Sequence, residues 1–76
     1  MNVAVAALET GSIAQGVVAC DAMVKTAEVD LIESCAVSPG KYWILIGGEV
    51  APVRAAHRRG IEVAAETLLD SLLISE

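Results

Sequence analysis

The stretch SCAVSPGKYWILI, residues 34–46, contains two apolar runs that meet at the short polar turn Ser38-Pro39-Gly40-Lys41. Pro presets φ at the second position of a turn, and Gly accepts the positive φ that a type II turn needs at the third. The stretch therefore predicts a β-hairpin, with antiparallel strands over 29–37 and 42–46. Apolar residues on both faces of the first strand indicate a central strand covered on both sides, or one with a face in an interface.

A helix is expected on either side of the hairpin. Ser12 and Gln15 fit a capping box at the start of a helix over 13–26. Gly47-Gly48 should end the third strand, and Pro52, tolerated only in a first turn, places the start of a second helix near Val50. That helix should run to about Leu68 or Leu69. The expected inner faces are Ile13, Val17, Cys20, Val24 and Ala27 in the first helix, and Val53, Ala56, Gly60, Ala64 and Leu68 in the second.

Short strands over 2–8, before Gly11, and over 71–74 complete the pattern. The order is then β-α-β-β-α-β, which predicts an α+β, ferredoxin-like fold: a four-stranded antiparallel sheet with two helices on one face. Because the chain has 76 residues, we expect a single domain over 1–76. Many activities share this fold, so the fold alone names no function.

The composition points to association between copies. Of the residues, 55% are hydrophobic and the mean hydropathy is +0.62, which is more apolar material than one small core hides. The alternative is an Ala-rich small domain. The chain contains no run of about 18 apolar residues, so a membrane span is not expected. The net charge is −5 and aromatic residues are few, which disfavours nucleic-acid binding. We therefore expect a homo-oligomer that binds neither membrane nor nucleic acid.

No catalytic or metal-binding pattern stands out. Cys20 and Cys35 are scattered, and His57 is expected on a helix surface beside Arg58, so neither a metal site nor a positioned general base is predicted. Arg54, Arg58 and Arg59 should form a solvated helix face, with Glu62 and Glu66 near enough to pair with them. The first residues carry no basic signal-peptide region, so we expect reduced thiols in a cytoplasmic protein. The prediction is a protein that is not an enzyme and has no cofactor.

Three blocks of the chain carry a family resemblance: ALETGSIA at 7–14, CDAMVKTA at 20–27, and Gly40-Lys41 followed by GGEVAPV at 47–53. They cover nearly the whole chain in order and resemble a bacterial microcompartment shell-protein (BMC) domain. The resemblance implies a structural protein that forms a flat six-sided tile, as a hexamer of single-domain chains or a trimer of tandem chains. Tiles pack edge to edge into a shell that encloses enzymes in the cytoplasm.

The resemblance also implies two sites. The turn of Ser38, Pro39, Gly40 and Lys41 matches the loop that lines a pore on the symmetry axis, where the groups that face the pore decide which small metabolites pass. The alternative is that this turn only connects two strands. Lys25 matches the family's tile-edge lysine, which lies against its counterpart on the neighbouring tile.

Two departures from the family pattern leave alternatives open. The sequence ends directly after the last expected strand, whereas most single-domain members continue, so we expect a truncated chain, a minimal variant or half of a tandem protein. Ser38 stands where some tandem members have a Cys that holds an iron–sulfur cluster, and a hydroxyl replaces a thiolate poorly. No cluster is therefore predicted. A competing interpretation is a ferredoxin-like regulatory or small-molecule-binding module that acts as a dimer.

Overall fold

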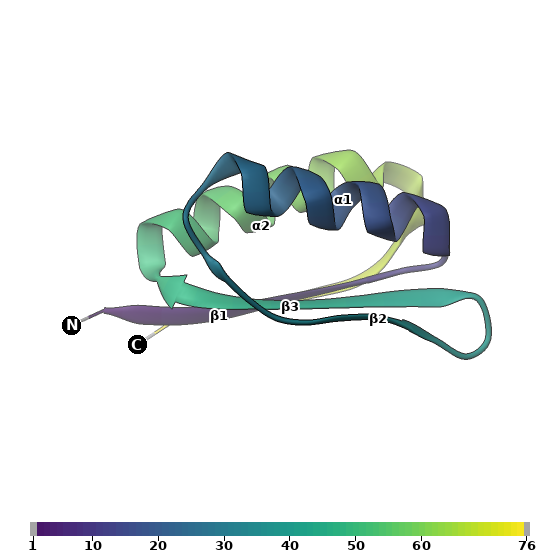
Figure 1. Ribbon diagram of the computed structural model, residues 1–76, viewed down its shortest axis with the longest axis horizontal. Coiled ribbons are helices and arrows are strands. Elements are labelled where there is room, and N and C mark those ends of the chain that lie inside the picture. The colour runs from purple at the N-terminus through teal and green to yellow at the C-terminus, as the bar shows by residue number, and fades with distance from the viewer. Residues whose placement is uncertain (1, 76) are drawn as a thin grey trace.

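The computed structural model describes residues 2–75 as a four-stranded antiparallel sheet with two helices packed on one of its faces (Figure 1). Across the sheet the strands lie in the order β2-β3-β1-β4. This arrangement confirms the predicted α+β, ferredoxin-like fold. The elements are β1 (Val3–Thr10), α1 (Ile13–Thr26), β2 (Asp30–Val37), β3 (Lys41–Glu49), α2 (Val50–Ala64), the 3-10 turn η1 (Ala65–Thr67) and β4 (Leu68–Ser75).

The strand register separates a covered face of the sheet from an open one. Ala6 of β1 pairs with Ile46 of β3 on one side and with Leu73 of β4 on the other. Because successive side chains alternate between faces, this row and its even-numbered neighbours in β1 and β3 point toward the helices. The odd-numbered residues of β1 point away from the helices. Large hydrophobic residues exposed on this open face include Val3, Val5, Ile32, Leu72 and Ile74.

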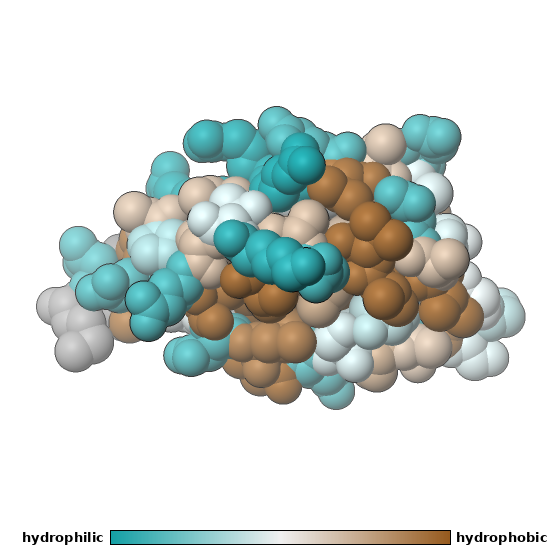
Figure 2. All heavy atoms as spheres, turned by 45° about the horizontal axis from the view of Figure 1, so that its top comes forward, coloured by the Kyte–Doolittle hydropathy of each residue, from teal (hydrophilic) through white to brown (hydrophobic). Residues whose placement is uncertain are grey.

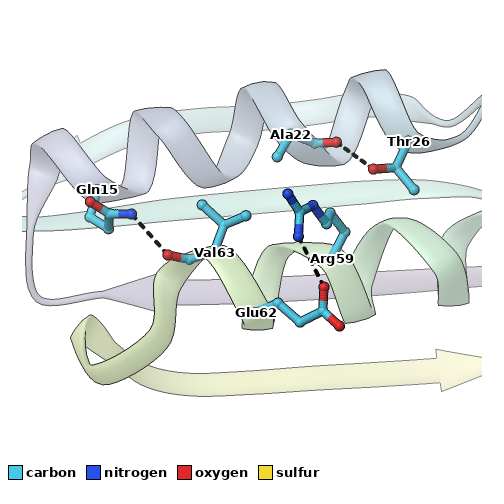
Figure 3. A network of polar contacts seen from close by, with 6 residues as sticks. All are labelled: Gln15, Ala22, Thr26, Arg59, Glu62 and Val63. Atoms are coloured by element: carbon cyan, nitrogen blue, oxygen red, sulfur yellow. Dashed lines mark hydrogen bonds and ion pairs between the residues drawn. The ribbon is translucent and has the colours of Figure 1, made fainter.

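The core is built from small residues, which let the helices lie close to the sheet. A Cβ added to Gly60 of α2 would lie 2.5 Å from Met23 Sδ and 2.6 Å from Leu8 Cδ1, so only glycine fits at this point. The Gln15 side chain ties the two helices together, since its Nε2 donates a hydrogen bond to the Val63 carbonyl at 2.8 Å (Figure 3). The largest fully buried side chains are Leu8, Met23, Ile44, Ile46, Val53 and Thr10.

The predicted inner face of α1 is mostly wrong. Ile13 is 42% exposed and Val17 is 49% exposed, and Figure 2 shows hydrophobic side chains gathered over this helix on the surface. Apolar residues occur on more than one side of α1, so their spacing alone does not identify the buried side. The steric fit with the sheet selects the side with small residues. The residues buried there are Gly16, Ala19, Cys20 and Met23.

The start of α1 is as predicted, but its cap is only half of a capping box. The Ser12 side chain accepts a hydrogen bond from the Gln15 backbone N–H at 3.1 Å. The Gln15 side chain reaches α2 instead of returning to Ser12. In α2, by contrast, four of the five predicted inner positions are buried, namely Val53, Ala56, Gly60 and Ala64. The fifth, Leu68, is half-buried and belongs to β4. Neither helix of residues 2–75 is long and apolar enough to cross a membrane.

Pairing within the sheet overrides several predicted boundaries. β3 does not end at Gly47-Gly48, because these residues pair with Val5 and Ala4 of β1. α2 stops at Ala64 because Ala65, with φ of 50°, leaves the helical conformation. The segment after η1 then joins the sheet already at Leu68, ahead of the strand expected over 71–74. β2 forms an edge of the sheet, so the first of its two predicted positions, a central strand, is wrong, and the second, a face in an interface, stays a prediction.

Candidate functional site

The β2–β3 turn is the first candidate site. Val37 pairs with Lys41, which leaves Ser38, Pro39 and Gly40 as the connection, and all three are exposed. Gly40 has φ of +69°, as the predicted turn requires, while the Ser38–Pro39 peptide bond is cis. Figure 1 shows the turn projecting beyond the ends of both helices. A projecting turn of this kind can contact another molecule with little obstruction from its own chain.

The chemistry available at the turn is limited to hydrogen bonding and charge. Ser38 supplies a hydroxyl, and Lys41 supplies an ammonium group that forms no ion pair within residues 2–75. Cys35 lies three residues before Ser38, within β2 and opposite Trp43 rather than in the turn. No group of three or more His, Cys, Asp or Glu side chains in the described part of the chain is placed to hold a metal ion.

A contact between α1 and the hairpin supports the turn, and sequence reasoning missed it. The Ser34 hydroxyl of β2 donates to Cys20 Sγ of α1 at 3.4 Å and also shares a hydrogen bond with the Tyr42 hydroxyl of β3. The Tyr42 ring packs against Gly16, where no side chain would fit. One helix is thus joined to both strands of the hairpin. The glycine in the middle of a predicted helix was the available signal for this close approach.

Lys25 is the second candidate site, and it lies in the last turn of α1. Its Nζ is 3.0 Å from Asp21 Oδ2, and both side chains are well exposed, at 74% and 59%. An exposed pair of this kind contributes little to stability, so its charges remain available to other molecules. Since α1 begins beside the hairpin turn and ends away from it, Lys25 and the turn lie toward opposite ends of the molecule (Figure 1). The structure does not bring the two candidate sites together.

His57 is more enclosed than its sequence position suggested. Its side chain is half-buried, and Nε2 is shielded from solvent without a hydrogen-bond partner among the described residues. Burial lowers the pKa of His57 below its usual 6.5, and the nearby backbone of Ala7 partly opposes this effect. His57 lines a hollow of about 400 Å³ between α2 and β4, together with Arg54, Arg58, Ile61, Glu62 and Leu73. The prediction of a simple surface histidine is therefore wrong.

The predicted pairing of the arginines holds for one of the three. Arg59 Nη1 is 3.1 Å from Glu62 Oε1, as Figure 3 shows. Arg54 and Arg58 are exposed and form no ion pair within residues 2–75. The open face of the sheet also carries a polar contact that was not predicted, because Trp43 Nε1 donates to Glu33 Oε1 at 2.9 Å.

Comparisons with a family model and with known proteins indicate the same protein family. A model of the BMC domain matches residues 4–76. The bacterial microcompartment shell protein PduT of Citrobacter freundii is 42% identical over 74 residues, which are 97% of this chain and 40% of PduT. The carboxysome shell protein CsoS1 of Prochlorococcus marinus is 38% identical over 73 residues, which are 96% of this chain and 70% of CsoS1.

A solved structure agrees with the sequence comparisons. A microcompartment protein from Desulfitobacterium hafniense DCB superimposes with a TM-score of 0.92 at 43% identity, over 95% of this chain and 40% of that one. The chain thus spans about two fifths of the length of PduT and of this structure. With a family model that matches nearly its whole length, the chain belongs to the BMC domain family.

Proposed function

We propose that this protein is a structural component of a bacterial microcompartment shell in the cytoplasm, and that its copies join into a ring-shaped tile, a hexamer. The observation that carries the proposal is the BMC match over residues 4–76. Relatives at 42% and 38% identity that are themselves named shell proteins support it. In this proposal residues 1–76 act as one BMC domain. Because the chain covers 40% of PduT, a ring of three longer chains is the second form to consider.

In the proposed ring, the β2–β3 turns of all copies meet around the axis. Ser38, Pro39, Gly40 and Lys41 then line a pore for small metabolites. The projection and exposure of the turn support this placement. The Ser38 hydroxyl would offer hydrogen bonds and the Lys41 ammonium would favour anions, since lining groups select by size, hydrogen bonding and charge.

At the other end of the molecule, Lys25 would lie at the edge of the tile. Its partner there is the same region of a neighbouring tile, and its high exposure supports such a contact. Other shell proteins and enclosed enzymes are the expected partners of the assembled shell. The role is structural rather than catalytic.

A dimeric regulatory or ligand-binding module is not favoured, because the relatives that cover nearly the whole chain are shell proteins. The two proposals differ in the number of copies that associate. Native mass spectrometry of the purified chain tests them directly. A mass of six copies supports the tile, whereas a mass of one or two copies contradicts the ring formed by this chain alone.

A further inference from the structure

Two pairs of like charges in this structure lack a counter-ion among the described residues. Arg54 and Arg58 lie four residues apart on α2, where side chains at this spacing are neighbours. Glu9 of β1 stands directly opposite Asp70 of β4 in the sheet. Within residues 2–75, the ion pairs join other residues, namely Lys25 with Asp21 and Arg59 with Glu62. Like charges at such positions repel, so each pair would be stabilised by opposite charge from outside the chain.

The basic pair borders the hollow between α2 and β4. This hollow measures about 400 Å³, and the apolar side chains of Ile61 and Leu73 also line it. Glu62 also lines the hollow, so two arginines and one carboxylate leave it with a net positive charge. We call this surface the basic hollow. It offers two guanidinium groups beside an apolar surface, a combination that suits an acidic and apolar protein surface.

The acidic pair borders a second hollow, on the opposite face of the sheet. Leu8 is buried toward the helices, so its neighbour Glu9 points to the open face, as does its register partner Asp70. This hollow measures about 160 Å³, and Trp43 and Leu72 line it with the two acids. Leu72 is 55% exposed and Ile74, next along this face of β4, is 60% exposed. We call this surface the acidic corner.

The two surfaces are opposite in charge, and each combines two like charges with apolar side chains. Within one copy they cannot meet, because the basic hollow belongs to the helix side and the acidic corner to the open side of the sheet. We propose that the basic hollow of each copy receives the acidic corner of the next copy. The contact joins two different surfaces, and such head-to-tail contacts close into rings when the rotation permits. This inference rests on the proposed ring and names the surfaces that build it.

Two charge-reversal variants test the contact. R54E/R58E gives a copy with two acidic surfaces, and E9K/D70K gives a copy with two basic surfaces. Each variant alone should fail to form rings, because every contact would then join like charges. When the two are mixed, every contact between unlike copies joins opposite charges. An even-numbered ring of alternating copies should therefore form again.

Native mass spectrometry of the wild type, each variant and the equimolar mixture gives the readout, with circular dichroism to verify that each variant is folded. We expect the wild type to form a species of six copies. Each variant alone should contain at least ten-fold less of this six-copy species. In the equimolar mixture, the ring should contain three copies of each variant. The control R59E reverses one arginine of the same helix that is paired within the chain and does not line the basic hollow. It should retain the ring.

The possible failures are distinguishable. If the wild type forms no ring, the proposed function fails. If the wild type forms rings and either reversed variant alone forms them equally well, the ring stands and the proposed contact is wrong. If folded variants lose the ring but their mixture does not restore it, the two surfaces do not meet each other and the inference is also overturned.

Discussion

Gly16 of α1 lies directly against the ring of Tyr42 in β3. A Cβ added at Gly16 would stand 2.7 Å from both Cγ and Cδ2 of that ring, which is closer than real side chains approach. The contact holds the N-terminal half of α1 against the strand that leads out of the projecting turn. The close approach of α1 at Gly16 therefore helps to fix the position of the candidate pore loop.

Gly16→Ala should destabilise the protein by about 1–3 kcal/mol, because the added methyl group overpacks a site with no room to relax. The better helix propensity of Ala, about 1 kcal/mol, should offset only part of this cost. Urea unfolding at one fixed protein concentration measures the change. Ala14→Leu, at an exposed position of the same helix, is the control and should shift stability by less than about 0.5 kcal/mol. Equal stability of Gly16→Ala and wild type would contradict the packing described here.

Much of the fold follows from local sequence signals. Ser12 sets the start of α1, Pro52 limits the start of α2, and Pro39-Gly40 marks the hairpin, because each residue has a backbone preference that acts locally. The inner face of α1 could not be read in this way, since valines lie on the side that the sheet does not cover. The end of β3 also depended on non-local pairing, because Gly47 and Gly48 continue the ladder with β1.

The candidate sites were predictable only in part. The turn and Lys25 were identified from the resemblance, and their roles remain predictions. His57 is enclosed because α2 lies against β4, and Glu9 stands opposite Asp70 because β4 pairs with β1. Neither contact can be predicted from one short segment of sequence. The sequence shows which residues are charged, but only the structure shows which of them form ion pairs within the chain.

The pore-lining role of the turn predicts that Ser38 residues of neighbouring copies lie close together. Ser38→Cys should therefore form covalent multimers under mild oxidation or with a short bis-maleimide. Denaturing electrophoresis detects these species as a ladder. The wild type, with Cys20 buried and Cys35 half-buried, controls for the native thiols. Ala51→Cys, exposed at the start of α2, controls for random collision. A Ser38→Cys protein that forms rings but crosslinks no more than these controls would contradict the pore assignment.

The tile-edge role of Lys25 predicts a separation between ring formation and sheet formation. Lys25→Ala removes an exposed charge whose partner in the chain is the similarly exposed Asp21, so folding should be nearly unaffected. Rings should persist in native mass spectra while extended sheets in electron micrographs become several-fold rarer. Lys41→Ala removes the same charge at the turn and should leave sheets unchanged. Unaltered sheets in Lys25→Ala would show that the edge lies elsewhere.

His57 should make stability depend on pH. Burial lowers its pKa in the folded protein, whereas in the unfolded chain the pKa stays near 6.5. The unfolded state therefore takes up a proton first as the pH falls. The contribution of neutral His57 is fully present above pH 6.5 and is lost as the pH falls toward the lower folded pKa. The other charged groups that line the same hollow are Arg54, Arg58 and Glu62.

Urea midpoints measured between pH 8 and pH 5.5 test this dependence. The wild type should lose stability over the lower part of the range, and His57→Gln should show a flatter profile, because it carries no titrating group at that position. Identical slopes for the two proteins would show that His57 does not titrate differently in the folded and unfolded states. Stability that rises as the pH falls would contradict the direction of the pKa change itself.

If copies of this chain form a tile, the β2–β3 turns should lie at its centre. Two-dimensional class averages of negatively stained particles show whether they do. We expect six-fold particles with a central depression, and a gold label coupled to Ser38→Cys should lie at that centre. Particles without rotational symmetry, or six-fold particles with the label at their rim, would show that the turns do not form the centre of a tile.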